Sequence, residues 1–415
     1  MSRRSRALFV TYGGGHVGMV LPVIRALERM HPETECVLMA LTTGHLKAGA
    51  IRPTLGYRDF LHLVDEKAAK TWGERLSEGN TSPDVPRDET IAYLGINYLD
   101  LIAQHGEAGA SDVYREQGRY GFRPLHFMRR VIEELQPGMV IATNSPRSEQ
   151  AALEAAKVLG IPSVGMVDLF GLDSDTYVMR DIKPDWTCVI SAAVRQRLIV
   201  RGFPVTGVVV TGNPAFDGLC ATENVAKAQE FIAAHGWQGL SPILWSGHIE
   251  PAGFSASSTQ AGHGLALEVE TRLREWIRSR RDLALIVRYH PSEWHTFPRQ
   301  PDQDRIHFSL PSLESIHPLI LAARVVVVQN STVGLESAVA GRPVVSLEYS
   351  PSVQRSFSLA TMGVSTSCDS PQELVDVLDR VLRTPGIPPK EYASDGYAAE
   401  RVAGVISLAL GTRIR

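Results

Sequence analysis

Cysteine is scarce in this chain, with four residues among 415 at positions 36, 188, 220 and 368. They lie far apart and form no CxxC pair or Cys/His ladder, so the sequence indicates neither a disulfide framework nor a structural zinc site. Charge of one sign is also lacking, because 42 Lys and Arg residues stand against 45 Asp and Glu residues, a net charge of -3. This balance argues against a protein that binds nucleic acid by neutralising phosphates.

Long hydrophobic runs are absent too. No apolar run approaches the ~20 residues that a membrane-crossing helix needs. The first residues, MSRRSRALFVTYGGGH, turn glycine-rich too early for a secretory signal. We therefore expect a cytoplasmic protein, which could still make peripheral contact with the inner face of the membrane. Hydrophobic residues make up 44% and charged residues 21%, and at ~100 to 200 residues per domain the length predicts two domains.

Short apolar runs alternate with amphipathic helical patterns along most of the chain. Strands that alternate with helices in this way predict an α/β fold of parallel sheets with both faces covered. We expect two Rossmann-like, doubly wound domains that face a cleft. The first spans residues 1–215 and the second residues 216–390, while residues 391–415 form a C-terminal helix that could pack back on the first domain. The pattern weakens between residues 51 and 120, where we expect an insertion or mobile loops, as at residues 70–87.

In an open α/β sheet, ligands lie beyond the carboxyl ends of the strands, where helix N-termini offer free N–H groups. The first such junction is Gly13-Gly14-Gly15-His16, directly after the strand at residues 7–12. Its glycines allow a close approach of backbone to a ligand. With an ordinary pKa near ~6.5, His16 could act as a general base or orient a bound group.

The second half carries the strongest signal, the string NSTVGLE at residues 330–336 between a strand and a helix. Ser331 and Thr332 can cap that helix and bind phosphate oxygens, and Glu336, one turn on, can accept both hydroxyls of a ribose. Two further junctions follow neighbouring strands. His290, before a proline, could bind phosphate with Arg288 beside it as a charge partner, and residues 246–250, SGHIE, precede a glycine- and serine-rich segment that would suit a lid.

These residues resemble those of the GT-B glycosyltransferases. The glycine turn with His16 is similar to that of the bacterial lipid II N-acetylglucosaminyltransferase. The segment Thr211-Gly212-Asn213-Pro214 with Asp217 is similar to the interdomain segment of GT-B enzymes and of UDP-N-acetylglucosamine 2-epimerases. The pair His290-Pro291 and the string NSTVGLE followed by AGRPVV resemble the motifs of capsule-polysaccharide enzymes, notably Kdo transferases and bacterial sialyltransferases.

The resemblance implies a glycosyltransferase of cell-surface polysaccharide synthesis that moves a sugar from a CMP-Kdo-like or UDP-sugar donor to a glycan or lipid-linked acceptor, with no obligatory metal or other cofactor. A sugar-nucleotide 2-epimerase on the same fold and a non-catalytic nucleotide-sugar binding protein are the alternatives. The expected catalytic residues are His16, Asp168 and Asp175. The acceptor side would be Gly13, Gly14 and Gly15. The donor site would comprise His248, Arg288, His290, Asn330, Ser331, Thr332, Gly334 and Glu336.

Overall fold

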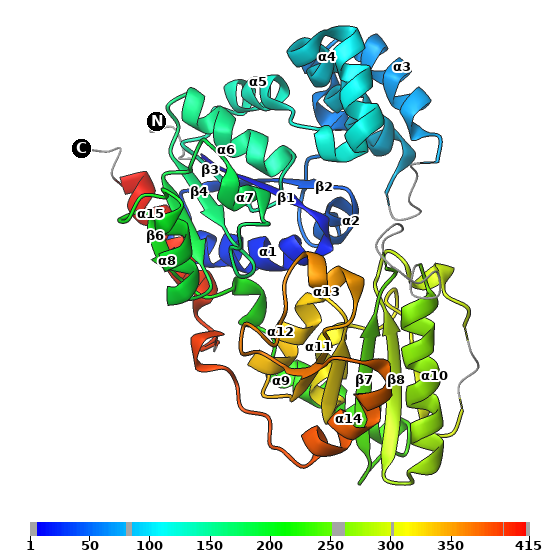
Figure 1. Cartoon of the computed structure of the whole chain (residues 1–415). Helices are drawn as coiled ribbons and strands as arrows, with labels where there is room; N and C mark the ends of the chain where they lie inside the picture. The colour runs from blue at the N-terminus through cyan, green and yellow to red at the C-terminus, as the bar shows by residue number, and fades with distance from the viewer. Residues whose placement is uncertain (1–5, 80–84, 251–261, 300–302, 393, 412–415) are drawn as a thin grey trace. The chain divides into compact units, whose positions relative to one another are not determined.

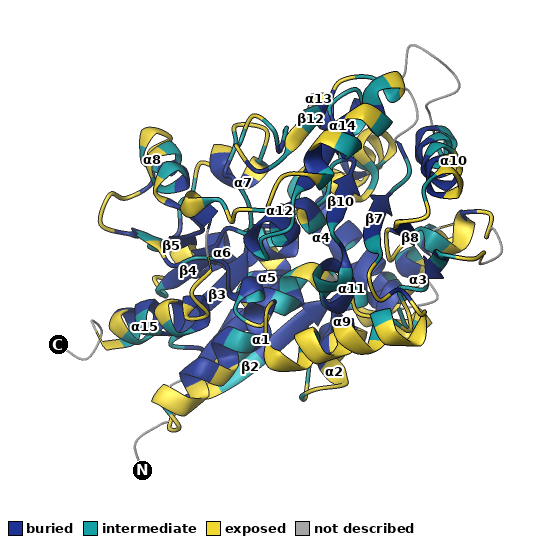
Figure 2. Ribbon diagram, turned by 90° about the horizontal axis from the view of Figure 1, so that it is seen from below, coloured by how far each residue is buried: buried dark blue, intermediate teal, exposed yellow. Residues whose placement is uncertain are grey.

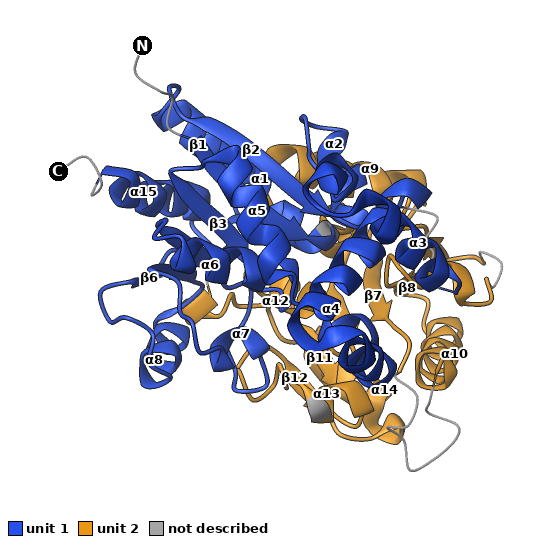
Figure 3. Ribbon diagram, turned by 90° about the horizontal axis from the view of Figure 1, so that it is seen from above, with its two compact units in different colours: residues 1–217, 394–415 blue, residues 218–393 orange. Residues whose placement is uncertain are grey.

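A computed structural model of the chain describes residues 6–79, 85–250, 262–299, 303–392 and 394–411 (Figure 1). The chain divides into two compact units. Unit 1 comprises Met1–Asp217 together with Ser394–Arg415, and unit 2 comprises Gly218–Ala393 (Figure 3). The last segment of the chain thus belongs to the same unit as the first.

Unit 1 is built on a six-stranded sheet in the order β2-β1-β3-β4-β5-β6, and every pairing is parallel. Its central strands are buried on both faces, as parallel strands with helices on each side must be (Figure 2). The strands are β1 (Arg6–Tyr12), β2 (Glu35–Leu41), β3 (Met139–Thr143), β4 (Ser163–Met166), β5 (Trp186–Val189) and β6 (Val208–Val210).

Helices cover both faces of this sheet. Apolar side chains of α1 (Gly13–Met30) and α15 (Ala398–Gly411) form one core with the sheet. On the other face, α6 (Ser148–Val158) lies against β1, β3 and β4 and also contacts α5 (Leu125–Leu135). Three further helices of the unit are α2 (Thr43–Gly49), α7 (Thr176–Met179) and α8 (Ala192–Val200).

The region between residues 51 and 120 is mostly helical, which corrects the expectation of mobile loops there. It holds α3 (Glu66–Ser77) and the long α4 (Arg87–Gln117), which pack on each other. The two helices approach closely at glycines: a Cβ atom on Gly95 would lie 1.8 Å from the carbonyl oxygen of Ala69. Charged side chains and glycines interrupt the apolar period of both helices, which hid them in the sequence. Residues 80–84 lie outside the described residues.

Unit 2 repeats the design with a second six-stranded parallel sheet in the order β12-β11-β10-β7-β8-β9. One face forms a core with α10 (Gly264–Ser279) and α14 (Leu374–Leu382). The other elements are α9 (Thr222–Ala234), α11 (Ile316–Ala322), α12 (Thr332–Val339) and α13 (Pro351–Arg355). The strands are β7 (Ser241–Gly247), β8 (Leu283–Tyr289), β9 (Ile306–Ser309), β10 (Val325–Val328), β11 (Val344–Leu347) and β12 (Thr366–Cys368).

Two doubly wound parallel sheets confirm the predicted fold class. The four cysteines are free thiols. No helix in the described part of the chain is both long and apolar enough to span a membrane.

Candidate functional site

The glycine turn of unit 1 leads β1 directly into α1. Gly13 has φ +73°, a conformation that favours glycine, and it stands between Tyr12 of the strand and the first helical turn. The N-cap of this helix, Tyr12, makes no side-chain capping hydrogen bond among the described residues. Gly13 therefore shapes the backbone of the turn, and Gly14, Gly15 and His16 follow it in the first turn of α1, at the carboxyl edge of the sheet.

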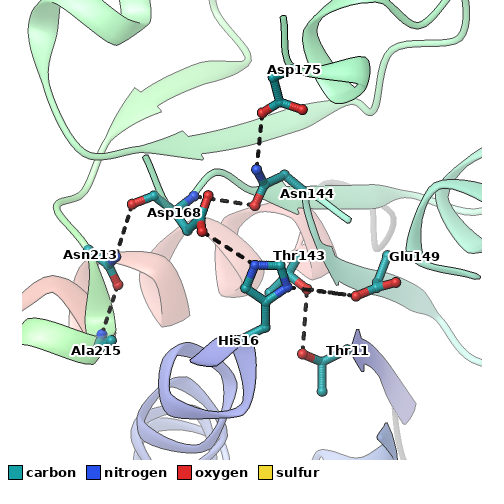
Figure 4. A network of polar contacts seen from close by, with 9 residues as sticks. All are labelled: Thr11, His16, Thr143, Asn144, Glu149, Asp168, Asp175, Asn213 and Ala215. Atoms are coloured by element: carbon teal, nitrogen blue, oxygen red, sulfur yellow. Dashed lines mark hydrogen bonds and ion pairs between the residues drawn. The ribbon is translucent and has the colours of Figure 1, made fainter. Parts of the chain in front are cut away.

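The His16 ring lies between two carboxylates (Figure 4). Its Nε2 atom is 3.4 Å from Asp168 Oδ2, and its Nδ1 atom is 3.8 Å from Glu149 Oε1. Burial lowers the pKa of His16, but the hydrogen bond to Asp168 and the negative charge of Asp168 and Glu149 outweigh it and raise the pKa to about 10. The imidazole is therefore protonated at neutral pH.

This protonation state corrects one expectation from the sequence. An ordinary pKa near ~6.5 would have left His16 free to accept a proton at neutral pH, whereas a ring with a pKa of about 10 carries both protons there and can donate one or stabilise negative charge. The sequence could not reveal the difference, because Glu149 and Asp168 approach His16 from segments more than a hundred residues away.

The side-chain amide of Asn144 connects Asp168 and Asp175 by hydrogen bonds. The side chain of Asn144 accepts from the Asp168 backbone N–H at 3.4 Å and donates to Asp175 Oδ2 at 3.1 Å. Burial raises the pKa of Asp168, but the bond to His16 overrides this effect and holds it below its ordinary value. Burial also raises the pKa of Asp175, and the charge of Asp168 adds to the rise. Two neighbouring carboxyl groups thus have pKa values moved in opposite directions, as acid and base pairs require.

Glu149 is a participant that the sequence reasoning missed. It lies in the first turn of α6, is fully buried, and its Oε1 atom accepts from Thr143 Oγ1 at 3.2 Å. Thr143 in turn lies 3.4 Å from Thr11, oxygen to oxygen. Among the described residues, Glu149 Oε2 has no hydrogen-bond partner. The sequence did offer one signal for Glu149: a carboxyl group at a core position of α6, a helix rich in alanine.

The segment Thr211-Gly212-Asn213-Pro214 supports the same cluster. Asn213 Nδ2 donates to the backbone oxygen of Asp168 at 3.1 Å, and its Oδ1 accepts from Ala215 N at 2.9 Å. Three residues further on, Asp217 caps α15 by accepting from Ala398 N and Ala399 N at 3.0 and 2.7 Å. This segment therefore fixes both the Asp168 loop and the final helix of unit 1.

In unit 2, Ser331 is the N-cap of α12 and accepts from Val333 N at 3.2 Å, as predicted. Thr332 is exposed. Glu336 Oε2 lies 3.4 Å from His317 Nε2, so its carboxylate has a partner in the protein.

Gly334, in the first turn of α12, is closely packed: a Cβ atom there would lie 2.4 Å from Leu359 Cδ1. Packing thus accounts for the glycine at this position, and a contact between Gly334 and a donor stays a prediction.

Arg288 and His290, at the end of β8, lie in different surroundings. Arg288 is buried and donates to Ser309 Oγ on β9 at 2.8 Å, and burial lowers its pKa to about 10, although nearby Glu314 opposes the change. It therefore points along the sheet instead of serving as the charge partner expected at the turn. His290 is exposed, and its Nδ1 atom lies 2.8 Å from Ser292 Oγ.

His248 and Asn330 are brought together at the ends of β7 and β10. The backbone N–H of Asn330 donates to His248 Nε2 at 3.3 Å, and His248 Nδ1 lies 3.0 Å from the oxygen of Ile249. An Nε2 atom that accepts this bond leaves the ring proton on Nδ1, where it faces the Ile249 oxygen. The segment proposed as a lid lies at residues 251–261, outside the described residues.

Metal ligands do not gather in either unit: within the described ranges, no three His, Cys, Asp or Glu side chains are placed to hold an ion. That the reaction needs no metal stays a prediction.

Comparison with known proteins places this chain by its fold. No protein-family profile and no curated sequence matches it. Among solved structures, it is similar to the S. aureus MnaA–UDP co-structure, with 16% identity, 98% of this chain and 97% of that chain covered and a TM-score of 0.59. It is also similar to the Methanocaldococcus jannaschii UDP-GlcNAc 2-epimerase in complex with UDP-GlcNAc and UDP, with 13% identity, coverages of 97% and 99% and a TM-score of 0.61.

A third similar structure is the wall teichoic acid polymerase TagF, with 9% identity, 100% of this chain and 91% of that chain covered and a TM-score of 0.56. At such identities the likeness shows the fold alone. The chain therefore shares its α/β fold with these proteins over nearly its whole length.

Proposed function

We propose that this protein is a sugar-nucleotide enzyme that inverts a carbon of the sugar of a UDP-sugar, in the manner of a UDP-N-acetylglucosamine 2-epimerase. The observation that carries the proposal is the cluster of Asp168, Asn144 and Asp175 beside the His16 imidazolium in unit 1. Likeness over the whole chain to an epimerase with UDP-GlcNAc and UDP bound supports it. This proposal replaces glycosyl transfer as the first interpretation, because the structural likeness favours the epimerase alternative.

Inversion at C2, the carbon that carries the N-acetyl group, needs one group to remove the C2 proton and another to return a proton on the opposite face. The electron pair left by that proton would form a C1–C2 double bond and expel UDP from C1, and re-addition of UDP at C1 as the proton returns would restore a sugar nucleotide. Asp168, kept ionised by His16, is suited to accept a proton. Asp175 has a raised pKa and is suited to hold one. In this scheme His16 acts as a fixed positive charge that stabilises negative charge developing near it.

Unit 2 would hold the nucleotide. The Thr332 hydroxyl is exposed at the N-terminus of α12, which follows β10, and His290 is exposed at the end of β8, two strands away in the same sheet. Glu336 would have to exchange His317 for a ribose hydroxyl, so its assignment to the ribose remains a proposal.

The test is to incubate the protein with UDP-GlcNAc in deuterium oxide and to follow the sugar protons by NMR. Epimerisation breaks the C–H bond at the inverted carbon, so that proton signal should disappear and a second sugar nucleotide should form without any acceptor. A protein that binds UDP-GlcNAc but leaves this proton in place would contradict the proposal. Asp168→Asn should abolish the exchange, while Asp173→Asn, an exposed carboxylate paired with Arg201, is the matched control.

Transfer of the sugar to a glycan or lipid-linked acceptor is the second candidate, favoured by the likeness to a teichoic acid polymerase. It predicts that UDP is released only when an acceptor is added and that no deuterium enters the sugar. A CMP-Kdo-like donor stays a prediction within this candidate. Assays that compare UDP release with and without glycan or lipid-linked acceptors separate the two activities.

A further inference from the structure

Glu250 is a fully buried carboxylate at the carboxyl edge of the second sheet, and among the residues that the structure describes none of its hydrogen-bond partners is a cation. Its Oε1 atom accepts from Gln329 Nε2 at 2.6 Å and from Ser350 Oγ at 2.5 Å. Its Oε2 atom accepts from the backbone N–H of Ser352 at 2.9 Å and from the Ser352 hydroxyl at 2.5 Å. Four donors therefore replace the water that a carboxylate would otherwise bind.

These donors come from different loops. Gln329 follows β10, whereas Ser350 and Ser352 precede and begin α13 after β11. Glu250 itself follows β7, and its backbone exchanges two hydrogen bonds with Gly262, at 2.9 and 3.0 Å. One side chain thus joins the loops that follow three adjacent strands of the sheet.

The connection continues to the nucleotide site proposed above. Because Gln329 donates to Glu250, its amide orientation is fixed, and its oxygen accepts from His248 N at 2.8 Å. His248 then accepts from Asn330 N through Nε2. Asn330 directly precedes Ser331, the N-cap of α12. A chain of hydrogen bonds therefore runs from Glu250 to the start of the helix that would bind phosphate.

We propose that Glu250 is the positioning residue of the nucleotide site, which sets the tautomer of His248 and the arrangement of the loops before α12 and α13. The inference rests on the proposed function for its ligand, but the geometry can be tested without it. Electrostatics alone predicts the opposite effect on binding: removal of a buried negative charge should make an anionic ligand bind more tightly.

The experiment compares wild type, Glu250→Gln and the exchange variant Glu250→Gln with Gln329→Glu, using UDP as the probe in calorimetry. An amide at position 250 places an NH2 group against donors, so the single variant should weaken UDP binding by about tenfold or more. The exchange variant restores one carboxylate and one amide to the pair and should recover most of the affinity. Leu378→Ala, a core truncation on α14, is the control, since it should lower Tm without removing any of these hydrogen bonds.

Two readouts need no ligand. In Glu250→Gln, amide hydrogen exchange should become faster at Asn330 and Ser352 than elsewhere in unit 2, and the imidazole nitrogen shifts of His248 should depart from the Nδ1–H tautomer. If Glu250→Gln does not fold, Ser352→Ala removes one of the four donors and should show smaller changes in the same direction.

UDP binding that is unchanged or tighter in the folded single variant would overturn the proposal, as would exchange that rises uniformly across unit 2. If wild type binds no UDP, the proposed function fails, and the exchange and tautomer readouts alone decide the role of Glu250.

Discussion

At the scale of single residues, chemistry in unit 1 is decided by neighbours that are distant in sequence. His16 was recognisable as a histidine at a strand-to-helix junction, but its charge is set by Asp168 and Glu149. A raised pKa also has a consequence for stability: His16 contributes stability that is fully present below about pH 6.5 and is lost as pH rises through about 10.

The same shift predicts the pH dependence of activity. If the His16 imidazolium stabilises developing negative charge, kcat/KM should stay level through pH 6.5 and fall as the pH approaches 10, where the ring loses its proton. His16→Gln should lower kcat by about a hundredfold or more and remove that alkaline limb. A profile of kcat/KM against pH for both proteins checks this, and a wild-type limb centred near 6.5 would show that His16 titrates as an ordinary base.

Thr332 offers the cleanest test of phosphate binding at α12. Ser331→Ala would also remove a helix cap worth about 1 kcal/mol, whereas Thr332 is exposed and is not the capping residue. Thr332→Val should therefore weaken UDP binding by about tenfold, the loss of one hydrogen bond to a charged group, at unchanged Tm. Calorimetry with UDP measures the affinity, and full affinity in the variant would remove this hydroxyl from the site.

At the scale of elements, the contact of α3 with α4 depends on two small positions. A Cβ on Gly73 would lie 2.0 Å from the oxygen of Ile91, and one on Gly95 is blocked by Ala69 in the same way. Either alanine must push the helices apart. Helix propensity alone would have favoured alanine at both places by up to ~1 kcal/mol.

Gly95→Ala should consequently lower the free energy of unfolding by about 1–3 kcal/mol, the usual cost of overpacking. Gly404→Ala in α15 is the matched control, because no described atom outside its own helix lies within 4 Å of a Cβ there, and it should be neutral or stabilising. Denaturant titrations measure both. Equal stabilisation of the two variants would mean that the close approach of α3 and α4 is absent in solution.

At the scale of the whole molecule, the chain closes unit 1 with its own end. α15 returns after unit 2 and covers the face of the first sheet that α1 shares. Ile406 is fully buried in this core, whereas Leu408, two residues on, is 64% exposed. The core of unit 1 is therefore complete only with α15.

Ile406→Ala should destabilise the protein by about 2–5 kcal/mol, as cavity-forming substitutions in cores do, while Leu408→Ala should change stability by less than ~0.5 kcal/mol. Thermal unfolding followed by circular dichroism measures the pair. Similar Tm values for the two variants would show that α15 is not docked on the first sheet.

The sequence by itself determined the alternation of strands and helices, the two doubly wound sheets and the junctions at His16 and Ser331, because apolar period and turn residues are local signals. It failed at residues 51–120, where helices rich in charge pack through glycines. Only the tertiary structure decided the charge of His16 and the presence of Glu149 and Asn144 beside it. It also decided the hydrogen bond from Arg288 to Ser309. These depend on contacts between segments far apart in the chain, and a pKa or a buried hydrogen bond has no counterpart in local sequence pattern.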